Sequence, residues 1–282
     1  MQNAKEWLRW ISAQIEQTYP APEAKQMAKL LLECLNVPMC DIIAEKNIAI
    51  DKGVLEEWLK RIASHEPIQY ILDEAHFYGY TFALQSSVLI PRPETEELVY
   101  YIIKEWNNQH STPQILDIGT GSGCIAITLA LEITPSDVLA WDISEKALEV
   151  AQQNATKLGA KNVTVARQDI LSDPILPQRF DIIVSNPPYV VDWEKEQMRP
   201  NVLEFEPSLA LFVPEHDPLL FYQHIAGFAL IHLKPNGGLY LEINERYGHE
   251  MCELLEGCGF VNVLLHQDIH GKNRFVSARM RT

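Results

Sequence analysis

The sequence predicts a two-domain protein whose larger part is a doubly wound α/β fold with a mostly parallel, seven-stranded sheet. From residue 114 onward, short apolar runs alternate with helical patterns, as in strands that are connected by crossover helices. Before residue 75 the apolar residues follow a helical period, which indicates a small helical bundle. The 282 residues suffice for two such cores.

The predicted N-terminal domain spans residues 1–75. Its helical period repeats on three apolar faces: Trp7, Leu8, Ile11 and Ile15; Met27, Leu30, Leu31, Cys34 and Leu35; Leu55, Trp58, Leu59 and Ile62. Residues 76–92 are aromatic and rich in strand formers, with Gly79 as the expected turn, and predict a hairpin linker. The remaining residues, 93–282, form the predicted α/β domain, which begins with a helix at Pro93.

Seven strands and four further helices are expected in the α/β domain. The strands are predicted at 114–118, 137–142, 162–168, 180–185, 237–243, 260–266 and 274–280, and the helices at 122–131, 144–158, 217–233 and 247–257. The last two strands are separated by too few residues for a crossover helix. They are therefore expected to pair antiparallel.

Composition and charge narrow the function classes. The chain is 47% apolar and 22% charged, an ordinary composition for a water-soluble protein, and no apolar run is long enough to span a membrane. The N-terminus lacks the apolar core of a signal peptide, so a cytoplasmic location is expected. The net charge of −15 disfavours nucleic acid and suits a basic protein partner, although solubility alone also explains it. Five cysteines without CxxC spacing predict reduced, buried thiols and no metal site.

A glycine-rich turn follows the first strand of the α/β domain. Gly119, Gly121 and Gly123 remove side chains where a ligand must approach the backbone. Their G-x-G-x-G spacing differs from the dinucleotide fingerprint G-x-G-x-x-G. Taken alone, such a turn is also explained by tight packing between a strand and a helix.

Three acidic residues stand at successive strand ends of the predicted sheet. Asp117 precedes the glycines, Asp142 ends the second strand, and Asp169 follows the third. An acid at the second strand end can accept both hydroxyls of a ribose, and Asp169 can meet an adenine amino group. Both also fit a helix N-cap. A nicotinamide dehydrogenase remains open on these residues, but no later segment suggests hydride transfer.

The segment SNPPYV, residues 185–190, ends the fourth strand of the α/β domain. Two consecutive prolines stop a strand, because proline lacks an N–H and fixes φ. The segment is thus either a strand-terminating turn or, at the edge where parallel sheets bind ligands, a reaction site.

Read together, LDIGTGSG, the acid at 142 and SNPPYV resemble the class I S-adenosylmethionine-dependent methyltransferases, and Asn-Pro-Pro-Tyr marks those that methylate a planar nitrogen. Three further segments, IPRPETEELV (90–99), HEPIQYI (65–71) and FEPSLAL (205–211), resemble the HemK-type release factor glutamine methyltransferases. The resemblance covers nearly the whole chain. One departure is Pro218, which stands where the family usually has glycine after FEPxxAL.

The resemblance implies the residues of the site. Catalysis is assigned to Asn186, Pro187 and Tyr189. Cofactor binding is assigned to Asp117, Gly119, Thr120, Gly121, Ser122, Gly123, Asp142, Ile143, Asp169, Ile170 and Asn186. Substrate binding is assigned to Asn186, Pro187, Pro188, Tyr189, Arg92, Glu94 and Glu206, the last of which as a lone acid also fits a solvated loop charge. His65 is more typical of a packed histidine than of an acid or base.

The chemistry of an amide explains the central residues independently. The amide nitrogen of glutamine is a poor nucleophile, because its lone pair is delocalised into the carbonyl. Two acceptors, the Asn186 side-chain oxygen and the Pro187 backbone carbonyl, can hold its two N–H groups, and Tyr189 offers a flat face to the amide plane. Catalysis is then positioning and electrostatics.

The resemblance implies transfer of a methyl group to the glutamine of the Gly-Gly-Gln motif in class I peptide chain release factors. A monomer is expected, and the acidic charge and the short apolar runs predict binding to neither nucleic acid nor membrane. Two alternatives stand beside it. An adenine-N6 nucleic-acid methyltransferase shares NPPY but calls for a basic channel, whereas this chain is acidic. A binding protein without turnover is disfavoured by the intact motif.

Overall fold

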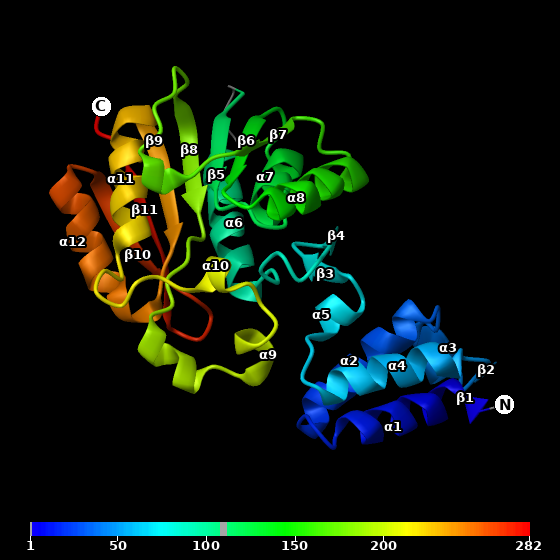
Figure 1. Ribbon diagram of the computed structural model, residues 1–282. Coiled ribbons are helices and arrows are strands. Elements are labelled where there is room, and N and C mark those ends of the chain that lie inside the picture. The colour runs from blue at the N-terminus through cyan, green and yellow to red at the C-terminus, as the bar shows by residue number, and fades with distance from the viewer. Residues whose placement is uncertain (1, 108–111) are drawn as a thin grey trace. The chain divides into compact units, whose positions relative to one another are not determined.

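The computed structural model describes residues 2–107 and 112–282. The described chain divides into two units, residues 2–74 with Arg199–Phe205, and Ala75–Met198 with Glu206–Thr282 (Figure 1). Each unit has its own apolar core.

The first unit is a helical bundle. Its elements are β1 (Gln2–Asn3), α1 (Ala4–Ile15), α2 (Ala21–Cys34), α3 (Met39–Ile43), β2 (Asn47–Ile48), α4 (Lys52–Ala63), α5 (Ile68–Ile71) and α9 (Pro200–Leu203). Helix α1 begins with a capping box, in which the Asn3 side chain and the Glu6 side chain each accept from the other residue's backbone N–H. The apolar faces of α1, α2 and α4 form the core, which confirms the helical bundle.

The second unit is built on a seven-stranded sheet. Its strands are β5 (Gln114–Ile118), β6 (Asp137–Asp142), β7 (Val163–Arg167), β8 (Phe180–Ser185), β9 (Leu233–Glu242), β10 (Val261–Gln267) and β11 (Asn273–Arg279). The spatial order is β10-β11-β9-β8-β5-β6-β7. Strand β11 runs antiparallel to both of its neighbours, β9 and β10, so the predicted antiparallel pairing of the last two strands is confirmed.

Helices cover both faces of this sheet (Figure 1). The helices of the second unit are α6 (Pro93–Trp106), α7 (Cys124–Glu132), α8 (Glu145–Leu158), α10 (Ser208–Leu211), α11 (Leu220–His232) and α12 (Gly248–Cys258), and its 3-10 turns are η1 (Ile170–Ser172), η2 (Asp192–Gln197) and η3 (Glu245–Tyr247). Neighbouring residues of a strand point to opposite faces. Ile182 accordingly packs with α6 and α7, and Ile183 packs with α11 and α12. The doubly wound fold class is thereby confirmed.

The expected hairpin consists of β3 (Glu74–Phe77) and β4 (Tyr80–Ala83), which pair with each other. Tyr78 and Gly79 form the turn, both with positive φ. The buried Asn154 of α8 accepts from Ala83 N–H at 2.7 Å and donates to Ala83 O at 2.9 Å, and also to Ser122 O at 2.9 Å. One side chain thus ties the hairpin to the glycine turn.

Among the described residues, no helix is both long and apolar enough to cross a membrane, and no group of His, Cys, Asp and Glu side chains is arranged to hold a metal ion. The thiols differ from the expectation of burial. Cys124 is buried, but Cys40 is exposed, because it lies in the first turn of the short surface helix α3.

Candidate active site

Three neighbouring parallel strands end at the same edge of the sheet. Ile118 at the end of β5 pairs with Ser185 of β8, and Ser185 pairs with Leu241 of β9. The order of the strands reverses between β5 and β8, which is where doubly wound sheets bind ligands. A Cβ added to Gly119 would lie 3.9 Å from the Asn186 backbone oxygen, so the glycine turn and SNPPYV lie side by side.

The glycine turn is shaped by left-handed backbone conformations. Gly119, Gly121 and Gly123 have φ values of +76°, +56° and +82°. At Gly123 a Cβ would also lie 2.8 Å from Ile127 Cδ1 and 3.3 Å from the backbone Cα of Ala151, so space as well as φ favours glycine here. Thr120 and Ser122 are buried between the glycines. The turn therefore presents backbone, not side chains, at the sheet edge.

Asp117 is fully buried at the end of β5. Its Oδ2 accepts from Thr120 Oγ1 at 2.7 Å and from Ala126 N–H at 3.2 Å. Its Oδ1 has no hydrogen-bond partner among the described residues. Burial raises the pKa of Asp117 to about 7, against the lowering effect of these two hydrogen bonds. This oxygen can therefore accept from a donor that the described residues do not supply.

Asp142 ends β6 beside the glycine turn. Its Oδ2 accepts from Gly121 N–H and its Oδ1 from Ser144 N–H, both at 2.9 Å. Burial raises the pKa of Asp142, and the backbone donors oppose this rise. Each carboxylate oxygen keeps a further lone pair for a ligand hydroxyl. The next residue, Ile143, is 41% exposed.

Asp169 follows β7 and acts as the N-cap of η1, where its Oδ1 accepts from Leu171 N–H at 2.9 Å. The capping alternative recognised in the sequence therefore describes what Asp169 does in this structure. Ile170 is buried and packs in the same cluster as Trp141 of β6. Contact of either residue with a cofactor stays a prediction.

The segment SNPPYV follows β8, and two of its side chains hydrogen-bond to buried polar residues. Asn186 Nδ2 donates to Thr95 Oγ1 at 3.4 Å, and the Tyr189 hydroxyl donates to Glu242 Oε1 at 3.3 Å. Pro187 is buried and Pro188 is half-buried. Within the described chain, no N–H or side chain donates to the Pro187 carbonyl. Burial raises the pKa of the Tyr189 hydroxyl, so this group stays neutral.

Arg92 and Glu206 form an ion pair at 2.6 Å, and the Glu206 side chain is completely buried. Glu206 also accepts from Ile90 N–H at 3.3 Å. Burial raises the pKa of Glu206, and Arg92 opposes the rise. Glu206 therefore is not a solvated loop charge: it fastens FEPSLAL to IPRPETE. Glu94 stays half-buried in the first turn of α6.

His65 has a φ of +65° and lies edge-on to Tyr19, with ring centroids 5.9 Å apart. This contact agrees with a packed histidine in the helical unit.

Comparison of the sequence with known proteins shows the family of this chain. A family model described as PrmC N-terminal domain matches residues 6–72, and one described as methyltransferase domain matches residues 109–255. A Bacteroides thetaiotaomicron protein named release factor glutamine methyltransferase is 45% identical over 274 residues, which cover 95% of this chain and 97% of that protein. The chain belongs to the release factor glutamine methyltransferase family.

A second member of the release factor glutamine methyltransferase family, from Flavobacterium psychrophilum, is also 45% identical, over 92% of this chain and 93% of its own length. Among solved structures, a Pyrococcus furiosus methyltransferase matches with a TM-score of 0.53 at 18% identity, covering 80% of this chain and 100% of its own. At that identity the match shows the shared fold. The chain is thus an S-adenosylmethionine-dependent methyltransferase of this family.

The residues present fit the cofactor of the release factor glutamine methyltransferases. S-Adenosylmethionine carries an α-amino group, a ribose and an adenine. The unpaired Oδ1 of Asp117 suits the amino group, Asp142 suits the ribose hydroxyls, and the exposed Ile143 offers apolar contact to the adenine. These assignments remain predictions for the individual residues.

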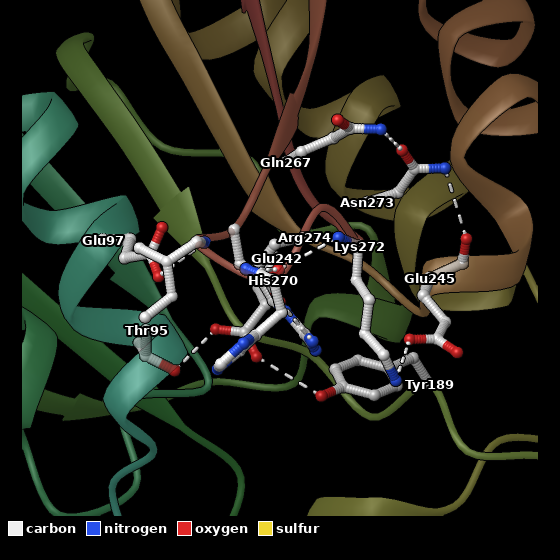
Figure 2. Close-up of polar contacts among 12 residues, drawn as sticks. Thr95, Glu97, Tyr189, Glu242, Glu245, Gln267, His270, Lys272, Asn273 and Arg274 are labelled. Carbon is white, nitrogen blue, oxygen red and sulfur yellow. Dashed lines mark hydrogen bonds and ion pairs between the residues drawn. The ribbon is translucent and has the colours of Figure 1, made fainter.

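Two buried polar residues at this site, Thr95 and Glu242, were not predicted from the sequence. Thr95, in the first turn of α6, donates to Glu242 Oε2 at 2.6 Å, and Glu242 stands at the end of β9 (Figure 2). Burial raises the pKa of Glu242, while Thr95, Arg274 and Tyr189 oppose the rise. Glu242 could have been predicted, because it is an acid at the end of a parallel strand, which is the pattern that indicated Asp117 and Asp142.

Proposed function

We propose that this protein transfers a methyl group from S-adenosylmethionine to the N5 side-chain nitrogen of the glutamine in the Gly-Gly-Gln motif of class I peptide chain release factors. The observation that carries the proposal is the side-by-side placement of the glycine turn and Asn186 at the switch point of the sheet. The names of the family relatives favour a protein glutamine over an adenine as the acceptor.

Asn186 and Pro187 hold the glutamine amide in this proposal. The Asn186 Oδ1 and the Pro187 carbonyl accept no hydrogen bond from the described residues, so both are free to accept the two N–H groups of a primary amide. Holding both hydrogens fixes the nitrogen in line with the methyl donor and stabilises the positive charge that develops on it. The bound cofactor supplies the electrophile, a methyl group on a sulfonium.

No general base is required at the nitrogen. Once methylated, the amide nitrogen is cationic and strongly acidic, so its extra proton leaves to water. The ionisable group next to the motif, Glu242, is fully buried and already accepts from Thr95 and Tyr189. It is therefore assigned no proton-transfer step.

The proposal extends to partners and location. Class I release factors are the partners, and the protein acts as a monomer that contacts neither nucleic acid nor membrane. Because release factors act in translation, the cytoplasm is the proposed location. We assign the first unit to recognition of the release factor, since a short Gly-Gly-Gln loop offers little contact area of its own.

Methyl-labelled S-adenosylmethionine tests the proposed acceptor. The purified protein is incubated separately with a class I release factor, with the same factor carrying Gly-Gly-Glu in place of Gly-Gly-Gln, and with adenine-containing DNA and RNA. Label is expected in the unaltered release factor alone. Label in nucleic acid, or equal label in the Gly-Gly-Glu variant, contradicts the proposal.

A further inference from the structure

Three side chains from distant parts of the chain form one hydrogen-bonded series behind SNPPYV. Asn186 Nδ2 donates to Thr95 Oγ1 at 3.4 Å, and Thr95 Oγ1 donates to Glu242 Oε2 at 2.6 Å. Thr95 is 2% exposed and Glu242 is 1% exposed, so water does not compete for these bonds. Figure 2 shows the Thr95 and Glu242 side chains turned toward each other from α6 and β9.

The series has a direction, because a threonine hydroxyl carries a single hydrogen. A carboxylate can only accept, so the Thr95 hydrogen lies on the short bond to Glu242. The hydroxyl then turns its lone pairs toward Asn186. Only the amino end of the Asn186 amide can satisfy them, which leaves Oδ1 facing away from Thr95.

This direction matters because the two ends of an asparagine amide have nearly the same shape and opposite hydrogen-bonding roles. With Oδ1 presented, Asn186 accepts from the amide N–H of a glutamine. With the amide reversed, an NH₂ group would face another NH₂ group, and the glutamine would be repelled.

The same carboxylate also holds the second anchored residue of the motif. Glu242 Oε1 accepts from the Tyr189 hydroxyl at 3.3 Å (Figure 2). Through Thr95 the same buried acid also holds Asn186, so it anchors both ends of Asn-Pro-Pro-Tyr. Burial raises the pKa of Glu242, and the Arg274 guanidinium, which pairs with Asp268 at 2.9 Å, opposes that rise. An acceptor-only Glu242 is what the direction of the series requires.

We propose that Thr95 and Glu242 are positioning residues that fix the Asn186 amide with its carbonyl oxygen toward the glutamine to be methylated. The inference rests on the proposed function and adds to it the orientation of the Asn186 oxygen that accepts from the glutamine amide. Neither residue touches the reacting atoms: both act through Asn186.

Steady-state kinetics with a full-length release factor test the proposal. Thr95→Val keeps the shape and removes the hydroxyl, so kcat is expected to fall ~10- to 100-fold. The affinity for S-adenosylmethionine, measured by calorimetry, is expected to stay within about twofold, because neither Thr95 nor Glu242 is among the residues assigned to the cofactor. Thr95→Ser restores the hydroxyl and should recover kcat to within about threefold of the wild type.

Thr128→Val is the matched control. Thr128 is also fully buried in a helix of the same unit, but its hydroxyl has no hydrogen-bond partner among the described residues. The same substitution there is expected to leave kcat unchanged. A purely structural role for Thr95 predicts instead that kcat follows the melting temperature in all three variants.

A second variant, Glu242→Gln, tests the same proposal and decides it if Thr95→Val does not fold. A glutamine can donate as well as accept, so the direction of the series is lost and kcat is expected to fall ~2- to 10-fold. Wild-type kcat in folded Thr95→Val, or in Glu242→Gln if Thr95→Val does not fold, overturns the inference. If the wild type itself leaves the release factor unmethylated, the proposed function fails instead.

Discussion

Asp117 is the residue whose titration bears most directly on the cofactor. Its pKa is raised to about 7 by burial, and one of its oxygens has no partner among the described residues. The protein therefore presents a neutral carboxyl below about pH 7 and a carboxylate above it. Only the carboxylate attracts the cationic amino group of S-adenosylmethionine.

The affinity for S-adenosylmethionine is accordingly expected to fall about tenfold for each pH unit below about 7. Above about pH 8 it should fall again as the α-amino group of the ligand loses its proton. Calorimetry from about pH 5 to about pH 9 measures both losses of affinity. The Asp117→Asn variant should bind weakly, and its affinity should not fall further below about pH 7. A constant affinity from pH 7 down to pH 5 speaks against this role of Asp117.

Asp142 carries the ribose in the proposed cofactor site. Asp142→Ala removes the carboxylate and also the acceptor of Gly121 N–H, which holds the glycine turn. Cofactor affinity is expected to fall ~10- to 100-fold, equivalent to about 1.4–2.8 kcal/mol. Unchanged affinity in calorimetry would remove the ribose role.

Asn186 is the residue on which turnover depends. Asn186→Ala removes the side-chain acceptor of the amide clamp, so kcat is expected to fall ~100- to 1,000-fold, as when one donor is removed from an oxyanion hole. Cofactor affinity should fall far less than kcat, because the glycine turn, Asp117 and Asp142 stay intact. Near wild-type turnover in a labelled-methyl assay would show that Asn186 does not hold the glutamine amide.

At the scale of elements, Asn154 links the β3–β4 hairpin, α8 and the glycine turn through three hydrogen bonds. Asn154→Ala leaves the backbone groups of Ala83 unpaired, and the free energy of unfolding is expected to drop by about 2–4 kcal/mol. Gln153→Ala, an exposed neighbour on the same helix, should change it by less than about 0.5 kcal/mol. Denaturant titration of both variants compares them, and equal losses would deny Asn154 this role.

The strands that hold the site were predictable from the sequence, because a buried parallel strand is a short, nearly continuous apolar run. The bounds of β5, β6 and β8 agree with the expectation. Strand β9 begins at Leu233, four residues before the predicted start, since Pro235 and Asn236 suggest a turn. The four-residue helices α9 and α10 were not predicted, because so short a segment shows no helical period.

The residues of the candidate site were predictable where they belong to a sequence motif or stand at the end of a predicted strand. The orientation of Asn186 was not, since it depends on Thr95 and Glu242, which are 147 residues apart in sequence. Likewise, nothing local in FEPSLAL indicates that Glu206 pairs with Arg92, 114 residues away. Pairings of this kind follow from the packing of the fold.

At the scale of the whole molecule, the net charge of −15 is expected to assist encounter with the release factor where that factor presents a basic surface. Salt screens such attraction, so KM for the release factor should rise as NaCl increases from about 50 mM to about 300 mM, while kcat stays constant. Initial rates at several release factor concentrations measure both constants. A KM independent of salt would leave the charge a role in solubility alone.

The central claim is that the methyl group reaches the side-chain nitrogen of one glutamine. Mass spectrometry of a proteolytic digest tests it, using a class I release factor incubated with the protein and S-adenosylmethionine. The peptide containing Gly-Gly-Gln is predicted to gain the mass of one methyl group in place of one hydrogen. Fragmentation should place that gain on the glutamine, and acid hydrolysis should release methylamine. An unmodified Gly-Gly-Gln peptide, or a methyl group on any other residue, contradicts the account.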